Sequence, residues 1–246
     1  MKKKILIAHG WIHSADTYKK LKNDLENTGL YDVNLYEFPG FGNSPARKYF
    51  SLMKYYTQEM ERELVNGAYD YVIGHSMGGN ILLRAMTGKS LNTKLILLSP
   101  EYNGIALLKP TMVFIPIMPL SFYLLKKMSC PVTTFFIKCM ALFTINSWDQ
   151  IDDQIVLDVR KASPIVATCT IFELAWDNWR IKRGQWKCGK VELILSEKDR
   201  LISRRKMKCL RDDLGDCHVY CLRGIGHTAV LEAYDRLLST LRKIMK

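Results

Sequence analysis

The segment Tyr69–Gly79, with the sequence YDYVIGHSMGG, most constrains how this chain can fold. An apolar run with the character of a strand leads directly into Gly74 and Ser76, and a helical pattern begins at Met77. A serine between small residues at a strand-to-helix junction is typical of a sharp turn that exposes its hydroxyl above a sheet. The same turn aims the next backbone N–H, that of Met77, at a developing oxyanion. The alternative interpretation is a glycine-rich turn with an incidental serine.

Strands alternate with helices on both sides of this segment. The expected strands are Lys4–Ala8, Tyr31–Tyr36, Tyr69–Ile73, Lys94–Leu98, Val191–Leu195 and His218–Leu222. The expected helices run from Ser14 or Asp16 to about Asn27, over 51–66, from Met77 to about Thr87, and over Ala229–Ile244. This alternation predicts an α/β fold with a mostly parallel sheet. Such sheets bind ligands at the carboxyl ends of their strands.

The middle of the chain, residues 102–187, breaks the alternation. It contains the apolar runs LLKPTMVFIPIMPLSFYLLKK and CPVTTFFIKCMALFTI, which prolines and lysines interrupt. A membrane span needs a longer and purer apolar stretch, so we expect a helical insertion over the strand ends instead. Further helices are expected at Asp149–Lys161 and Thr170–Arg183. The predicted organisation is a core formed by residues 1–101 and 188–246, with a helical cap, or lid, at 102–187.

A serine nucleophile needs a general base, and the chain offers five histidines, at positions 9, 13, 75, 218 and 227. His227 lies in RGIGHTAVLE, between the last strand and the last helix, where a loop can reach the serine. His218 begins a strand, and His75 is held inside the serine turn. We therefore predict His227 as the base; the alternative is a surface loop histidine.

The base needs an acid that fixes its tautomer and stabilises the imidazolium. Asp199 follows the strand Val191–Leu195 in LILSEKDRLIS. The order Ser76, Asp199, His227 is the order of triad residues in this type of fold. Glu197, close by in the sequence, and Glu101, after an earlier strand, remain alternative acids.

A second oxyanion donor is expected after the first strand, where His9-Gly10-Trp11 occurs. The backbone N–H of Trp11 is the candidate. The alternative is that the turn is only structural and that the indole packs in the core. Both can hold, because the donor is a backbone group.

The sequence resembles the α/β-hydrolase superfamily, and specifically its lidded branch of serine esterases, lipases and C–C hydrolases. Within this branch it is similar to carboxylesterases and monoacylglycerol lipases. The motifs that carry the resemblance are HGW (9–11), FPGFGNS (38–44), GHSMGG (74–79), SEKD (196–199) and GIGH (224–227). They occur in the family's order. The middle of the chain does not match, but there the family has a variable helical cap. Because the family has one or two strands before the HG motif, we expect a sheet trimmed to about six strands.

The resemblance implies an enzyme that cleaves a carboxylic ester, a lipid-like ester or a thioester through an acyl-enzyme intermediate. Ser76 would be the nucleophile, His227 the base and Asp199 the acid, with the N–H groups of Trp11 and Met77 as oxyanion donors. No metal and no organic cofactor is implied. Branches with an aspartate nucleophile, such as haloalkane dehalogenases and epoxide hydrolases, are excluded. A C–C hydrolase, a cofactor-free haloperoxidase and a non-catalytic small-molecule-binding protein on the same scaffold remain alternatives.

The substrate and partners depend on the cap and on charge. The apolar residues of 102–187 would form an acyl pocket or only the core of the cap itself. The chain has a formal net charge of +12, which fits an acidic acyl carrier protein, an anionic membrane surface, or an ordinary basic surface. No nucleic-acid-binding motif occurs, so no nucleic acid partner is expected. Seven irregularly spaced cysteines and the short apolar run after MKKK favour free thiols and a cytoplasmic location.

Overall fold

The computed structural model describes residues 1–47, 50–128, 131–142, 145–146, 153–182 and 184–246. Six parallel strands form one sheet in the order β2-β1-β3-β4-β5-β6. Their bounds are Lys3–Ala8 (β1), Tyr31–Tyr36 (β2), Tyr71–His75 (β3), Lys94–Leu98 (β4), Val191–Ser196 (β5) and Cys217–Leu222 (β6). The predicted fold class, a parallel sheet of about six strands flanked by helices, is confirmed.

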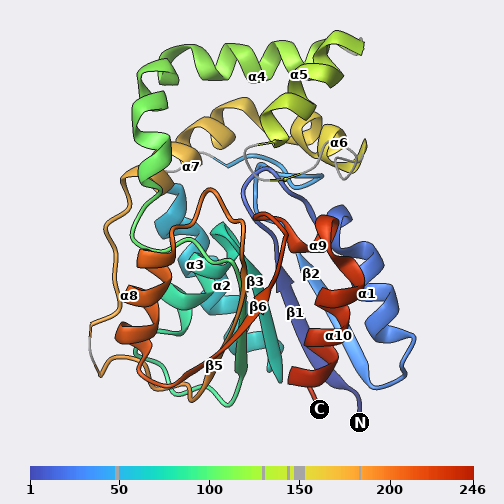
Figure 1. The fold of residues 1–246 in the computed structure, drawn as a ribbon, viewed down its shortest axis with the longest axis vertical. Helices are drawn as coiled ribbons and strands as arrows, with labels where there is room; N and C mark the ends of the chain where they lie inside the picture. Colours follow the sequence, from blue (N-terminus) through green and yellow to red (C-terminus); the bar gives the residue numbers. More distant parts are fainter. Residues whose placement is uncertain (48–49, 129–130, 143–144, 147–152, 183) are drawn as a thin grey trace.

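Helices cover both faces of the sheet (Figure 1). The 3-10 turn η1 and helices α1, α9 and α10 pack on one face, and α2, α3 and α8 pack on the other. Their bounds are Ala15–Tyr18 (η1), Lys19–Glu26 (α1), Leu52–Gly67 (α2), Met77–Met86 (α3), Arg204–Leu214 (α8), Ala229–Glu232 (α9) and Tyr234–Ile244 (α10). Because both faces are covered, the central strand β3 is buried along its whole length, and a nearly continuous apolar run suits such a strand.

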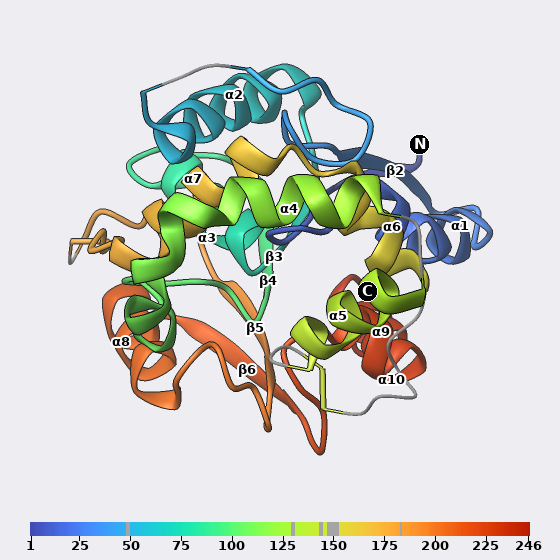
Figure 2. The same cartoon turned by 90° about the horizontal axis from the view of Figure 1, so that it is seen from above.

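The segment between β4 and β5 forms a separate layer of helices. We call these the insertion helices: Ala106–Ile117 (η2), Met118–Lys127 (α4), Pro131–Ala141 (α5), Asp153–Lys161 (α6) and Pro164–Trp176 (α7). They lie over one end of the sheet, opposite the end where both chain termini lie (Figures 1 and 2). Among the described residues, none of the helices has the length and hydropathy of a membrane span.

The register of the central strands brings three loops together beneath the insertion helices. Ala8 of β1 pairs with Gly74 of β3, which pairs in turn with Leu97 of β4. Parallel strands in register end at the same edge of a sheet. The loops after β1, β3 and β4 therefore meet there, and they contain the HGW motif, the serine turn and Glu101.

Several predicted helix boundaries were wrong. The helix expected over Ala229–Ile244 is two helices, because the backbone of Ala233 (φ −150°, ψ 50°) is not helical and interrupts it. The helix expected over Thr170–Arg183 runs from Pro164 to Trp176. Its Pro164 suits the first turn of a helix, where no backbone N–H is needed. The helix expected from Asp149 begins at Asp153, and residues 149–152 lie outside the described residues.

Candidate active site

Ser76 lies in a strained turn between β3 and α3. Its backbone has φ +51° and ψ −114°, a region that residues with a Cβ avoid, and its side chain is buried. The turn is held by its own backbone: the Ser76 N–H donates to Leu98 O at 3.1 Å, and the Ser76 carbonyl accepts from the N–H of Glu101 at 3.0 Å. Strain of this kind persists only where the surrounding structure fixes it, and such positions cluster at functional sites.

Gly78 allows this turn to pack closely on β1. A Cβ at Gly78 would lie 2.5 Å from the carbonyl oxygen of Ala8, which no side chain tolerates. The close approach sets the start of α3 against the end of β1. Met77 is the first residue of α3, so its N–H has no acceptor within the helix and is free to bind another oxygen.

Gly10 brings the loop after β1 against the serine. A Cβ at this position would lie 2.8 Å from His75 Nδ1 and 3.3 Å from Ser76 Cβ. Trp11 follows directly in the same loop. Its indole contacts the insertion helices: the Nε1–H donates to Ala167 O at 3.0 Å, and the ring meets Phe122 edge-on. The role of its backbone N–H stays a prediction.

Asp199 and His227 form the expected pair. His227 Nδ1 and Asp199 Oδ2 are 2.7 Å apart, and both side chains are about 5% exposed or less. Burial disfavours the charged form of the Asp199 carboxyl group. This effect is outweighed by the charge and hydrogen bond of His227 and by hydrogen bonds from the N–H groups of Ile202 and Leu201. The pKa of Asp199 therefore lies below its ordinary value. Of the alternative acids, exposed Glu197 accepts from the N–H of Gly224.

His75 connects the serine turn to the His227 loop. Its Nε2–H donates to the carbonyl oxygen of His227 at 3.1 Å, and the two rings lie 5.0 Å apart. Burial, with the nearby His227, lowers the pKa of His75 well below its ordinary value, so the ring stays neutral. The structure thereby brings Ser76, the neighbour of His75, and the Asp199–His227 pair together at the same edge of the sheet.

Glu232 braces the His227 loop from within, a role that the sequence reasoning missed. Its buried carboxylate accepts from the backbone N–H groups of Gly226 at 2.8 Å and Thr228 at 3.3 Å, the residues on either side of His227. It also accepts from the N–H of Asn146 at 3.1 Å. The only signal for it in the sequence is a glutamate five residues after the histidine.

Glu101, the second alternative acid, belongs to another network. Its carboxylate accepts from Asn80 Nδ2 and, at 2.7 Å, from the N–H of Gly104. Asn80 also donates to Asp177, which Arg84 binds through both oxygens at 2.6 Å. Burial, with the charge of Asp177, raises the pKa of Glu101 to about 8. The network joins α3 to the end of α7, so it anchors the insertion helices beside the serine turn.

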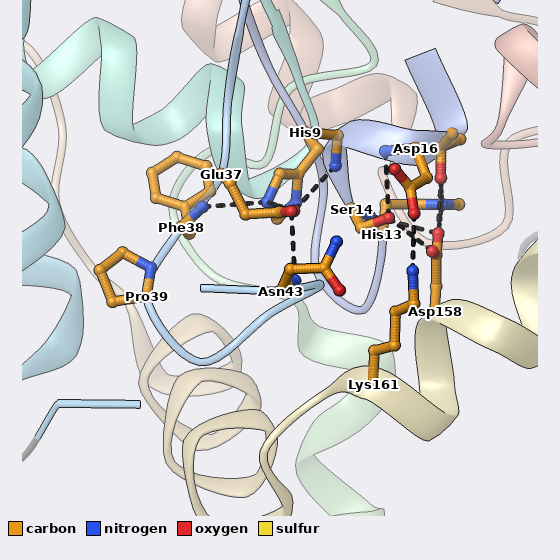
Figure 3. Close-up of polar contacts among 12 residues, drawn as sticks. His9, His13, Ser14, Asp16, Glu37, Phe38, Pro39, Asn43, Asp158 and Lys161 are labelled. Carbon is orange, nitrogen blue, oxygen red and sulfur yellow. Dashed lines mark hydrogen bonds and ion pairs between the residues drawn. The ribbon is translucent and has the colours of Figure 1, made fainter. Parts of the chain in front are cut away.

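Asp158 of α6 makes a second anchor (Figure 3). Its buried carboxylate accepts from Ser14 Oγ at 2.6 Å and Ser14 N at 3.2 Å, and from the hydroxyl of Thr17. His13 Nδ1 lies 3.8 Å away. Burial raises the pKa of Asp158, but His13 and the two hydroxyl donors lower it more, so it lies below its ordinary value. The anchor holds α6 to the loop that carries Trp11.

His9 has a structural role in the same region. Its Nε2 accepts from the N–H of Phe38 at 3.1 Å (Figure 3). Its Nδ1 therefore carries the proton and donates to Gly10 O at 2.8 Å. Burial lowers the pKa of His9 to about 4. His218 is exposed on β6 and lies 3.4 Å from Glu192, so it takes no part in the site.

An apolar pocket of about 90 Å³ lies between the Trp11 loop and the insertion helices. Trp11, Ile12 and His13 form one wall. The other wall consists of Ile137, Met140 and Ala141 from α5 and Ile155, Asp158 and Val159 from α6. Within the described residues, no group of three or more His, Cys, Asp or Glu side chains could hold a metal ion.

Comparisons with known proteins agree with this architecture. A family model described as the alpha/beta hydrolase family matches residues 5–240. An esterase from Thermogutta terrifontis, solved with malate bound, has a TM-score of 0.76 at 15% identity, over 100% of this chain and 90% of that chain. The enol-lactonase from Burkholderia xenovorans has a TM-score of 0.77 at 12% identity, over 100% and 92%. A deformylase from Pseudomonas putida has a TM-score of 0.73 at 18% identity, over 98% and 92%. No curated protein matches the sequence.

Proposed function

Since this chain belongs to the alpha/beta hydrolase family, we propose that it is a serine hydrolase that cleaves a carboxylic ester with a compact apolar acyl group. The observation that carries the proposal is the buried 2.7 Å pair of Asp199 and His227, held by His75 against the strained turn of Ser76. Nucleophile, base and acid in this order and setting are what acyl transfer to water requires. An esterase and an enol-lactonase are among the similar structures.

In the proposed mechanism, Ser76 Oγ attacks the ester carbonyl while His227 Nε2 accepts the hydroxyl proton. Asp199 keeps the proton of the imidazole on Nδ1 and stabilises the imidazolium. The N–H groups of Met77 and Trp11 bind the oxyanion of the tetrahedral intermediate, and each such donor contributes about 3 kcal/mol to the transition state.

Collapse of this intermediate breaks the ester C–O bond. His227 returns its proton to the leaving alcohol, and the acyl group stays on Ser76. A water molecule then attacks the acyl-enzyme while His227 accepts its proton. The second collapse returns a proton to Ser76 Oγ and releases the carboxylic acid.

The pocket beside Trp11 supports an apolar acyl group of limited length. Its volume of about 90 Å³ accommodates only several water-sized groups, and its lining is mostly aliphatic and aromatic. We propose that the insertion helices act as a cap over this pocket, with α5 and α6 as its outer wall. A short to medium acyl chain would fill it, and a long chain would have to displace α5.

Active-site labelling tests the nucleophile. A fluorophosphonate probe phosphonylates only a serine that a base activates, so it should label the native protein and leave Ser76→Ala unlabelled. Ser99→Ala, another serine at a strand end with φ +39°, is the matched control and should label like the native protein. Equal labelling of Ser76→Ala and the native protein would refute the assignment.

A series of p-nitrophenyl esters from acetate to palmitate tests the substrate class. We expect kcat/KM to rise from acetate to a medium chain and to fall again at the longest chains, as the pocket fills. Probe labelling without turnover of any ester would reject ester hydrolysis while keeping Ser76 as the nucleophile. That result would favour C–C bond hydrolysis.

A further inference from the structure

Apolar side chains gather on the solvent side of the insertion helices. We call them the outer apolar face. It consists of the exposed residues Val113, Phe114, Ile117, Leu120, Tyr123, Leu124, Met128, Val132, Phe135, Phe136 and Met140. These residues belong to η2, to α4 with its C-cap Met128, and to α5. Helices α4 and α5 lie at the end of the molecule opposite the chain termini (Figure 1). They make up more than half of the exposed large apolar side chains among the described residues. A concentration of this size marks an interaction surface.

The segment that carries this face is basic. No aspartate or glutamate occurs between Glu101 and Asp149, although the chain has 24 acidic residues in all. The same stretch contains four lysines, at positions 109, 126, 127 and 138. Lys126 and Lys127 are exposed at the end of α4, beside Leu124. A partner that covers η2, α4 and α5 therefore meets apolar groups among lysines, and exposed Asp153 of α6 lies 3.5 Å from one of them, Lys138.

We propose that the outer apolar face binds the surface of an anionic lipid bilayer. Helices that present large apolar side chains beside lysines, without acidic residues, bind at the boundary between headgroups and acyl chains. The apolar side chains enter the boundary, and the lysines contact the anionic headgroups. Tyr123 and Trp176 are about half exposed and have the amphipathic rings favoured at such boundaries.

Charge and chemistry favour a bilayer over two other occupants. An acidic carrier protein would match the lysines but would leave most of the apolar side chains without a partner. A second copy of this chain would match the apolar side chains but would bring two lysine-rich faces together, and like charges across an interface repel. A bilayer satisfies both properties of the face at once.

Docking in this way would turn the end of the sheet that carries Ser76 toward the bilayer, because the insertion helices lie over that end (Figure 1). The inference goes beyond the proposed function, since binding to lipid needs no hydrolysis. It can therefore hold or fail whether or not Ser76 acts as a nucleophile.

Vesicle co-sedimentation tests the proposal. The full-length protein should sediment with vesicles of equal parts phosphatidylcholine and phosphatidylserine, and only weakly with phosphatidylcholine alone. Binding should weaken as salt is raised, because salt screens the attraction of exposed lysines. Ser76→Ala should bind as the native protein does. Absence of binding to the anionic vesicles, or equal binding to both, would overturn the proposal.

Matched variants locate the binding surface. Lys126→Gln with Lys127→Gln should reduce partitioning about 25-fold, since each basic residue near an anionic surface contributes about fivefold. Lys2→Gln with Lys246→Gln removes the same charge at the opposite end and should change partitioning less than about twofold. Equal losses in the two pairs would mean that only net charge matters and would overturn the assignment.

A second pair tests the apolar contribution. Leu124→Ser with Phe136→Ser should reduce partitioning at least tenfold, whereas Leu30→Ser with Val65→Ser, even more exposed but outside the insertion helices, should not. Unchanged thermal unfolding midpoints show that the variants are folded. Binding of an acidic carrier protein without binding to vesicles, or a concentration-dependent dimer that Leu124→Ser with Phe136→Ser dissociates, would assign the face to another occupant and overturn the proposal.

Discussion

Replacement of Asp158 by Asn should loosen the insertion helices from the core. One carboxylate oxygen accepts from Ser14 Oγ and Gln154, and the other from Ser14 N and Thr17. The amide of Asn has only one acceptor oxygen, so two of these hydrogen bonds to a charged group are lost. Each contributes about 1.5 kcal/mol or more to the free energy of unfolding. The expected loss is about 3 kcal/mol. In a chain of this size that lowers the thermal unfolding midpoint by about 6–12 °C.

The assay is thermal unfolding at neutral and acidic pH, with Asp153→Asn as the control. Asp153 lies on the same helix, but its side chain is 87% exposed, so its replacement should lower the midpoint by less than about 2 °C. The pKa of Asp158 is lowered in the folded protein, so its stabilising effect is complete above the ordinary value of 3.8 and is lost as the pH falls below it. The difference between Asp158→Asn and the native protein should therefore shrink in acid.

A double-mutant cycle with Thr17→Val tests whether the contact itself is responsible. Thr17 donates to the Asp158 carboxylate from the core side of the contact. The two substitutions together should cost about 1 kcal/mol less than the sum of the single losses, because they remove the same hydrogen bond. Additive losses, or a midpoint for Asp158→Asn equal to that of Asp153→Asn, would refute the view that this carboxylate holds α6 to the core.

Three further predictions concern the candidate active site. The free energy of unfolding of Ser76→Gly, measured by urea denaturation, should be about 1 kcal/mol higher than that of Ser76→Ala, because glycine relieves the strain at φ +51°. Asp199→Asn should lower kcat for a p-nitrophenyl ester about 10⁴-fold, with Glu197→Gln within about twofold of the native rate. Glu232→Gln should lower kcat about tenfold with little change in KM, because it loosens the loop that carries His227, whereas exposed Asp235→Asn should leave kcat unchanged. A change in KM alone would contradict this role of Glu232.

The strands and the serine turn could be predicted from the sequence because their signals are local. Buried strands in a covered parallel sheet are short apolar runs, and two of the six, Tyr31–Tyr36 and Lys94–Leu98, have the predicted bounds. The charged helix α8 had no counterpart among the predictions. Its apolar stripe of Met207, Leu210 and Leu214 has helical spacing, but arginines and lysines dominate the composition of the segment.

The contacts that support the site could not be predicted, because they join distant parts of the chain. Asp158 and Ser14 are 144 positions apart in the sequence. Asn80 and Asp177 are 97 positions apart, and nothing in either neighbourhood indicates the other. One partial signal was present: Ser76, Asn80 and Arg84 recur every four residues, which places them on one face of a helix. The roles of Ser76, Asp199 and His227 stay predictions until they are tested.

Helix α5 connects the two proposals, because it has one side on the pocket and the other on solvent. Ile137 and Ala141 are buried beside Trp11, while Val132, Phe135 and Phe136 belong to the outer apolar face. Its main neighbour is α6, which Asp158 fixes to the core. A bilayer that covers the outer side would remove the cost of exposing those three side chains, and it would leave the attachment through α6 in place. Lipid contact would therefore stabilise α5 where it forms the pocket wall, so anionic vesicles should raise kcat/KM for esters whose acyl chain just fills the pocket more than for acetate.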